Sequence, residues 1–201
     1  MTDATCYAVD VPRNGKVVRD RLRQAALELF IEHGFDQTTA ERIAARAGVT
    51  ERTYFRHFAD KREVLFGAEA ELRDELTRAL AAVPAHLEPL PALRAAFHEV
   101  VPLVERNRPV TELGARVIAA TPALQERQLA KWAALVALLT DALTARGVDA
   151  YAAQLCAQVG VNVCAIAIKR WMDDPSAGLD AELERAFHEL YEASTALKVP
   201  G

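Results

Sequence analysis

Apolar side chains recur three or four residues apart along most of the chain, which is the spacing of one face of an α-helix. The first such run predicts a helix over 17–33, with these apolar positions: Leu22, Ala25, Ala26, Leu29 and Phe30. Gly34 is expected to end it in the left-handed conformation that glycine adopts readily. Thr38 and Glu41 form a capping box that opens a second helix, and Gly48 ends that helix.

Two more helices complete the first third of the chain. Thr50 caps a short third helix that ends near Phe58. Asp60 and Glu63 repeat the capping pattern at the start of a fourth helix, which runs to about Val83. A glycine-containing turn between two short helices is typical of the helix-turn-helix. The pattern therefore predicts a helix-turn-helix head.

Helical spacing continues beyond Pro84 in five longer runs: 92–106, 110–120, 122–146, 149–172 and 179–197. No stretch alternates apolar and polar residues in the manner of a strand. We therefore predict an all-α protein of about nine helices. Its expected parts are a flexible arm at 1–15, a helix-turn-helix domain at 16–66 and a larger helical body at 67–201.

Composition narrows the class of protein. Hydrophobic residues make up 51% of the 201, which is enough for a buried core. The longest uncharged apolar run, 155–168, is too short to span a membrane, and the first residues lack the pattern of a secretory signal. Cys6, Cys156 and Cys164 have no paired spacing, so we expect reduced thiols in a cytoplasmic protein, with no disulfide framework and no metal site.

Charge is unevenly distributed along the chain. The net charge of −4 by itself argues against nucleic-acid binding. Residues 13–62, however, hold 11 Lys and Arg against 7 Asp and Glu, whereas 67–201 hold 13 against 18. A mildly basic head on an acidic body fits phosphate contacts confined to the head. Ordinary scatter of surface charge is the alternative explanation.

The stretch TERTYFRHF, Thr50–Phe58, holds three aromatic residues and two arginines. At 100° per residue, Tyr54 and Phe58 share one face, which is the expected core face, and Phe55 lies at its boundary. The opposite side carries Arg52, Thr53, Arg56 and His57. Arginine can donate two hydrogen bonds to guanine, and all three residue types can hold phosphates. The stretch is therefore interpreted as a recognition helix, with a solvated charged helix as the alternative.

The chain closely resembles the DNA-binding head of tetracycline-repressor (TetR) family regulators in two segments, AALELFIEHGFDQTT (25–39) and RIAARAGVTERTYFRHFADKREVLF (42–66). The resemblance implies an all-α homodimer, in which each subunit has a three-helix DNA-binding head. It also implies that the body, 67–201, is a ligand-binding and dimerisation domain of about six helices.

The same resemblance assigns roles to residues of the head. It implies phosphate contacts by Thr39 and Lys61, at the starts of the second and fourth helices. It implies base reading by Glu51 and Arg52, early in the recognition helix. Phe55 matches an aromatic position that often faces DNA, although tyrosine is more usual there. For the three remaining matches, Thr53, Arg56 and His57, the resemblance implies contacts with DNA phosphates or the DNA backbone.

Small residues form one stripe along 149–172, at spacings of four, three and four: Ala153, Ala157, Gly160 and Cys164. The last predicted helix has apolar residues at matching spacing, among them Leu183, Phe187 and Leu190. Because small residues let helices approach closely, we expect these two helices to form a four-helix bundle with their copies in a second subunit. Packing within one chain is the alternative.

A weaker resemblance covers 121–174, which is similar to the C-terminal domain of actinobacterial-type regulators proposed to sense acyl-CoA-like ligands. We therefore expect a small effector that is acyl-CoA-like or another hydrophobic compound. Asn162 would either hydrogen-bond to a neighbouring helix or line the effector pocket. Arg116 would pair with an acidic ligand, with a carboxylate of the protein or with a helix end. The apolar residues predicted to line this pocket would suit a filled core equally well. The full set of predicted pocket residues is Phe97, Leu103, Arg116, Val117, Trp132, Leu135, Leu139, Asn162, Ile166 and Trp171.

No catalytic grouping, nucleotide-binding loop or metal-ligand spacing stands out, so we expect neither catalysis nor a cofactor. The predicted function is a ligand-responsive transcriptional regulator. It would bind a palindromic double-stranded DNA operator as a homodimer, usually to repress, and leave it when the effector binds. The alternatives are a DNA-binding regulator without an effector, and a small-molecule-binding protein or enzyme with a vestigial head.

Overall fold

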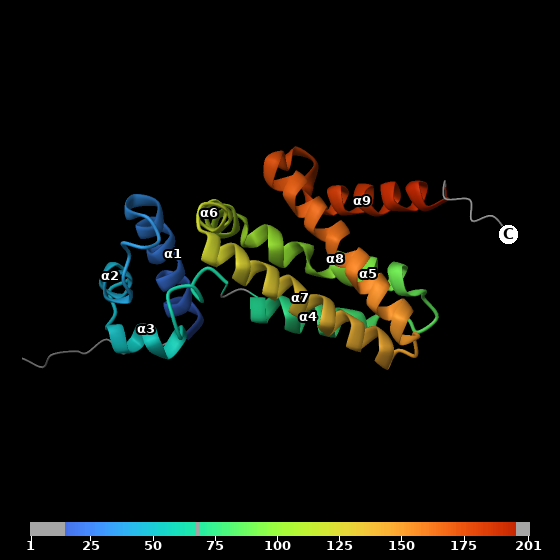
Figure 1. Cartoon of the computed structure of the whole chain (residues 1–201), viewed down its shortest axis with the longest axis horizontal. Coiled ribbons are helices and arrows are strands. Elements are labelled where there is room, and N and C mark those ends of the chain that lie inside the picture. The colour runs from blue at the N-terminus through green and yellow to red at the C-terminus, as the bar shows by residue number, and fades with distance from the viewer. Residues whose placement is uncertain (1–14, 67–68, 196–201) are drawn as a thin grey trace, which may run out of the picture. The chain divides into compact units, whose positions relative to one another are not determined.

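The computed structural model describes residues 15–66 and 69–195, and the chain divides into two compact units, Met1–Gly67 and Ala68–Gly201. Every regular element in the described ranges is helical: nine α-helices and one short 3-10 helix (Figure 1). The all-α prediction is confirmed for these ranges. Most of the predicted arm at 1–15 lies outside the described residues, and Gly15 begins the first helix.

The first unit, called the head below, contains α1 (Gly15–His33), α2 (Ala40–Arg46) and α3 (Glu51–His57), and α2 packs against both of the others. The apolar positions predicted for the first helix are almost completely shielded from solvent, with Leu22 and Ala26 fully buried. The elements and turns that follow contribute further buried side chains: Ile43, Tyr54, Phe58 and Val64. A helical spacing of apolar residues thus gives the head its core.

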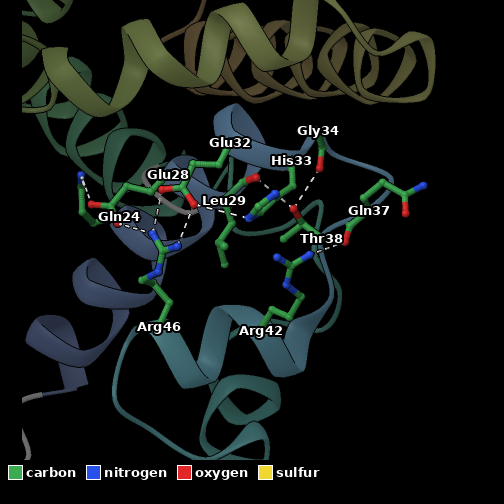
Figure 2. A network of polar contacts seen from close by, with 10 residues as sticks. All are labelled: Gln24, Glu28, Leu29, Glu32, His33, Gly34, Gln37, Thr38, Arg42 and Arg46. Atoms are coloured by element: carbon green, nitrogen blue, oxygen red, sulfur yellow. Dashed lines mark hydrogen bonds and ion pairs between the residues drawn. The ribbon is translucent and has the colours of Figure 1, made fainter.

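The start of α2 differs from the predicted one. Thr39 is its N-cap, and the Thr39 hydroxyl accepts a hydrogen bond from the Arg42 N–H at 3.2 Å. Thr38 is buried, and its hydroxyl donates to the carbonyls of Leu29 (3.2 Å) and Gly34 (2.9 Å), as Figure 2 shows. The predicted capping box at Thr38 is wrong, because the Thr38 hydroxyl donates to carbonyl groups at the end of α1 instead of capping α2.

The fourth helix also begins later than predicted, at Glu69 instead of Asp60. The Asp60 carboxylate does accept hydrogen bonds from the N–H groups of Arg62 (2.7 Å) and Glu63 (3.0 Å). These bonds open a series of turns that reaches Phe66, so the predicted cap forms but does not start a long helix.

The second unit, called the body below, contains α4 (Glu69–Ala82), α5 (Pro89–Arg106), α6 (Arg108–Ala119), α7 (Pro122–Ala145), α8 (Ala150–Asp173), the 3-10 helix η1 (Pro175–Ala177) and α9 (Gly178–Thr195). Helix α8 packs against α5, α7 and α9, and α4 packs against α5 and α7. One continuous apolar core fills the space between them. The predicted boundaries of α5 to α9 lie within three residues of these.

The small-residue stripe of α8 faces this core. Ala153 and Ala157 are fully buried, and a Cβ atom on Gly160 would lie 3.0 Å from Leu93 Cδ1 and 3.4 Å from Phe97 Cε2 of α5. The stripe therefore lets α5 approach α8 within one chain. The prediction that it forms the dimer interface is wrong for these residues, and half-buried Cys164 packs against the same core.

The apolar residues predicted for the same interface on α9 also face inward. Leu183 and Phe187 are buried, and the Phe187 ring lies 6.4 Å from that of Phe97 between centroids. Leu190 is partly buried against the same core. Helical spacing identified the apolar side of α9 but could not say that α5 and α8 of the same chain cover it.

The opposite side of α8 is exposed and mixes large apolar side chains with the amides of Gln158 and Asn162. Tyr151, Leu155 and Ile166 are all more than half exposed, and no charged residue occurs between 150 and 168. By length and composition alone, α8 is apolar enough to cross a membrane, although a third of its most apolar window is buried in the body. An apolar surface of this kind usually marks an interaction site.

Replacement of Gly160 by leucine is expected to destabilise the body by about 1–3 kcal/mol, because the added side chain must displace Leu93 and Phe97. Urea unfolding followed by circular dichroism measures this change. Ala133→Leu, which enlarges an exposed position of α7, is the control and should change the free energy of unfolding little. Equal stability of the two variants would contradict the close α5–α8 contact.

Candidate nucleic-acid interface

The turn between α2 and α3 depends on Gly48. Its φ of +66° lies in the left-handed region that favours glycine, and the next residue, Val49, donates its N–H to the Ala44 carbonyl at 3.0 Å. A Cβ atom on Gly48 would lie 2.9 Å from the guanidinium of Arg21, which donates to the Ala47 carbonyl. Helix α1 thus supports the turn that sets the direction of α3.

Helix α3 is held on the head by Tyr54. This side chain is fully buried, and its hydroxyl donates to the Asp60 carbonyl at 3.1 Å. Its ring lies 5.8 Å from the Phe58 ring, as the predicted core pair, and meets Phe55 edge-on at 5.3 Å. Burial, and then the charge of Asp60, raise the pKa of the Tyr54 hydroxyl above its usual value.

The other side of α3 points away from this core. Glu51, Arg52 and Arg56 are exposed, and Phe55 is 52% exposed. Within residues 15–66, neither Arg52 nor Arg56 has a hydrogen-bond or ion-pair partner, so both guanidinium groups are available to a ligand. The boundary position of Phe55, which the sequence left open, is thus an exposed one.

A hollow of about 330 Å³ lies along one side of α3. Its lining includes Thr53, Arg56 and His57, which the sequence had singled out, and four further residues, Gly15, Val18, Val49 and Thr50. Sequence reasoning missed these four because the first turn of α1 and the cap of α3 meet only in the folded head. Thr50 and Thr53 share a hydrogen bond of 3.0 Å between their hydroxyls.

His57 lies at this hollow with an unused polar atom. Its Nε2 is shielded from solvent and has no hydrogen-bond partner among the described residues. Burial first, and then the positive charges of Arg56 and Arg19, lower the pKa of His57 below its usual value. A negatively charged group entering the hollow would supply the acceptor that Nε2 lacks and reduce the repulsion from these arginines.

Lys61 does not have the surroundings expected of a phosphate contact. Its ammonium group donates to the carbonyls of Phe35 (2.8 Å), Asp36 (3.3 Å) and Thr38 (3.3 Å), and lies 4.3 Å from the centre of the Phe35 ring. The sequence could not show this, because the carbonyl groups come from a turn more than 20 residues away. Thr39, by contrast, is exposed at the start of α2.

An ion-pair network fixes the other end of α2. Figure 2 shows Arg46 facing two carboxylates one turn apart on α1. Its guanidinium contacts both oxygens of Glu32, at 2.7 and 3.0 Å, and one oxygen of Glu28 at 3.2 Å. The hydrogen bond from Arg46 holds the pKa of the Glu32 carboxyl below its usual value. Arg46 is thus engaged within the head and is less available to a ligand than Arg52.

The residues predicted to line an effector pocket separate into two groups in the body. The apolar core contains Phe97, Leu135, Leu139 and Trp171, and partly buried Trp132 packs against it. Leu103 and Val117 are also buried. Asn162 and Ile166 are exposed, because they lie on the opposite side of α8 from its buried stripe. Arg116 is exposed and pairs with Glu112 on its own helix at 3.2 Å. For these three the pocket role stays a prediction.

Two family models match the chain. The model of bacterial regulatory proteins of the TetR family matches residues 22–68, which include α2, α3 and the turn between them. The model of the MftR C-terminal domain matches residues 87–195, more than half of the chain. The two matches cover most of the head and most of the body.

Named relatives agree with these models. TcmR of Streptomyces glaucescens, an HTH-type transcriptional regulator, is 36% identical over 138 residues, which are 65% of this chain and 61% of TcmR. The chain thus spans less than two thirds of that relative. MftR of Mycobacterium tuberculosis, named as a transcriptional regulator of mycofactocin biosynthesis, is 28% identical over 192 residues, 88% of this chain and 94% of MftR.

A solved structure supports the fold. The transcriptional repressor FadR of Thermus thermophilus, in complex with lauroyl-CoA, superposes with a TM-score of 0.52 and 27% sequence identity. The superposition covers 91% of this chain and 96% of FadR. Both units of the chain therefore have counterparts in one known regulator.

Tyr54→Phe is expected to lower the free energy of unfolding by about 0.5–1.5 kcal/mol at neutral pH, because the hydrogen bond to the Asp60 carbonyl is lost. Because the pKa of Tyr54 is raised by folding, its stabilising effect is present below about pH 10 and is lost as the pH rises further. The Tyr54→Phe variant should therefore lose less stability between neutral and strongly alkaline pH than the unaltered protein does. Urea unfolding at several pH values measures both effects.

The matched control is Tyr191→Phe, which removes a hydroxyl from a 63% exposed tyrosine. It should resemble the unaltered protein at every pH. An alkaline loss of stability that persists unchanged in Tyr54→Phe would show that another group causes it.

Proposed function

Because the chain belongs to the TetR family of bacterial regulatory proteins, a family of DNA-binding transcription regulators, we propose that α3 reads double-stranded operator DNA in the major groove. The observation that carries this proposal is the two-sided character of α3. Tyr54 and Phe58 are buried, whereas Arg52 and Arg56 are exposed without partners in the described head. A helix that only completed a core would not need such an outward face.

The exposed residues of the head divide into two kinds of contact. Glu51 and Arg52 begin α3 and are proposed to read base edges, arginine by two hydrogen bonds to guanine. Half-exposed Phe55 suits contact with a thymine methyl group. Phosphate contacts are assigned to Thr39 at the start of α2 and to the residues of the hollow, Thr53, Arg56 and His57.

A second copy of the chain is the proposed cover for the exposed apolar side of α8. The residues assigned to this interface are Tyr151, Leu155 and Ile166, with Asn162 among them, in place of the buried stripe. An uncharged helical face of this length fits an isologous contact better than solvent. A twofold dimer would carry two recognition helices, as a palindromic operator requires.

The effector is proposed to be small and largely apolar, and an acyl-CoA is the first compound to test. Support comes from the match to the MftR C-terminal domain and from FadR, which was solved with lauroyl-CoA. Binding would release DNA only if the effector prefers a dimer whose heads no longer fit the operator. A regulator without an effector is the second candidate, favoured by the continuous packing of the predicted pocket residues in the core.

The protein is accordingly assigned to the cytoplasm as a repressor without catalytic activity. Its relatives are transcription regulators, which is what supports the absence of catalysis.

Arg52→Ala is expected to weaken binding to the operator by about 1–3 kcal/mol, roughly 5- to 150-fold, and to relax sequence preference at one position. Fluorescence anisotropy with DNA flanking the protein's own gene, and with a scrambled fragment, measures both quantities. Arg62→Ala is the control, because it removes the same charge from a residue that pairs with Asp60. Equal losses on operator and scrambled DNA for Arg52→Ala would refute base reading.

Ile166→Glu is expected to convert a dimer into a monomer, because it places a charge in the proposed α8 interface. Sedimentation velocity measures the change, and Ala133→Glu on the exposed side of α7 is the control. A monomeric unaltered protein would contradict the dimer. A protein that sediments with lipid vesicles would show that the apolar side of α8 meets a membrane instead.

A further inference from the structure

We propose that Lys61 is a positioning residue, which fixes the turn before α2 and so places Thr39 for contact with DNA, without itself touching a phosphate. This inference rests on the proposed function, since it concerns how the head meets DNA. It departs from the role that the sequence resemblance implies for Lys61. Three observations support it: the use of the ammonium donors, the anchoring of the Lys61 backbone, and the place of Thr39.

The donors of Lys61 are used within the head. An ammonium group has three N–H donors, and three carbonyl groups lie within 3.3 Å of Nζ: those of Phe35, Asp36 and Thr38. The Phe35 ring, 4.3 Å away, adds a cation–π contact. A phosphate could be bound only by giving up at least one of these bonds. The side chain therefore joins the turn that leads into α2 to the segment after α3.

The backbone of Lys61 is held in place from the side of α3. The Asp60 carbonyl accepts the hydroxyl proton of Tyr54 at 3.1 Å. The Asp60 carboxylate accepts hydrogen bonds from the N–H groups of Arg62 and Glu63, at 2.7 and 3.0 Å. Lys61 thus extends from a segment fixed by the recognition helix itself. Through Lys61, the position of α3 determines that of the turn at residues 35–38.

Thr39 is the residue that this connection places. The preceding residue, Thr38, is held twice: its carbonyl accepts from Lys61, and its hydroxyl donates to the Leu29 and Gly34 carbonyls. Thr39 follows directly, exposed, with its hydroxyl already accepting from the Arg42 N–H. That hydroxyl keeps its own proton to donate to a phosphate oxygen. Loss of the Lys61 bonds would free the turn and misplace this donor.

The salt dependence of DNA binding separates positioning from direct contact. Each phosphate neutralised by a cationic side chain contributes about 0.9 to the slope of log K against log salt concentration. Arg56→Met, which removes a proposed phosphate contact, should lower the magnitude of the slope by about 0.9. Lys61→Met should weaken binding about 5- to 10-fold through the misplaced Thr39 bond, with a change in slope of less than half that of Arg56→Met. An equal change in slope for the two variants would overturn the proposal.

A double-mutant cycle tests whether Lys61 acts through Thr39. Thr39→Val should weaken operator binding about fivefold in the unaltered background and less than twofold in the Lys61→Met background. Additive losses would overturn the proposal, since they would show that the two residues act independently. Lys61→Arg, whose guanidinium can still donate to carbonyl groups, should recover part of the lost affinity. Thermal melting of each variant confirms that only folded protein is compared.

Amide hydrogen exchange distinguishes failure of this inference from failure of the proposed function. If the unaltered full chain binds no operator fragment at low salt, DNA binding itself is refuted, and with it the placement of Thr39 for DNA. Exchange in the free protein still tests the connection. The N–H groups of Arg42 and Ile43, which bond to Thr39, should exchange faster in Lys61→Met than in Arg56→Met. Equal exchange would show that Lys61 does not hold the turn.

Discussion

Burial of Tyr54 is the constraint on which the geometry of the head depends. Its ring is fully buried beside that of Phe58, and its hydroxyl bonds to the Asp60 carbonyl, so these contacts fix the rotation of α3 about its axis. A rotation of one residue would expose this ring and turn Phe55, or Thr53 with His57, toward the core in its place. The outward position of Arg52, Arg56 and the hollow at His57 follows from that single anchor.

The surroundings of α3 transmit this constraint to the rest of the head. Asp60 connects Tyr54 to Lys61, and Lys61 connects α3 to the turn before α2. Arg46 and the carboxylates of α1 hold the other end of α2 (Figure 2). The body depends on a different feature, the close approach of α5 to α8 at Gly160. In both units, elements that carry the exposed functional side chains are fixed from the opposite, buried side.

Much of this could be predicted from the sequence, because helical spacing and capping act locally. The helix order, the core pair Tyr54 and Phe58, and the exposed arginines of α3 follow from positions a few residues apart. What could not be predicted depends on long-range partners. The small-residue stripe of α8 suits a second subunit or α5 equally well, and only the fold shows that α5 covers it. Thr38 and Lys61 likewise bind carbonyl groups whose availability no local pattern reveals.

Hydrogen exchange measured by mass spectrometry, with and without an operator fragment, tests the central claim most directly. The account predicts slower exchange on DNA binding at 39–43 and 50–57, where the exposed side of the head meets the duplex. Exchange in α7 should change far less, since no DNA contact is assigned to it. Protection confined to the body, with none at 50–57, would contradict the account, because DNA would then bind to a surface other than α3.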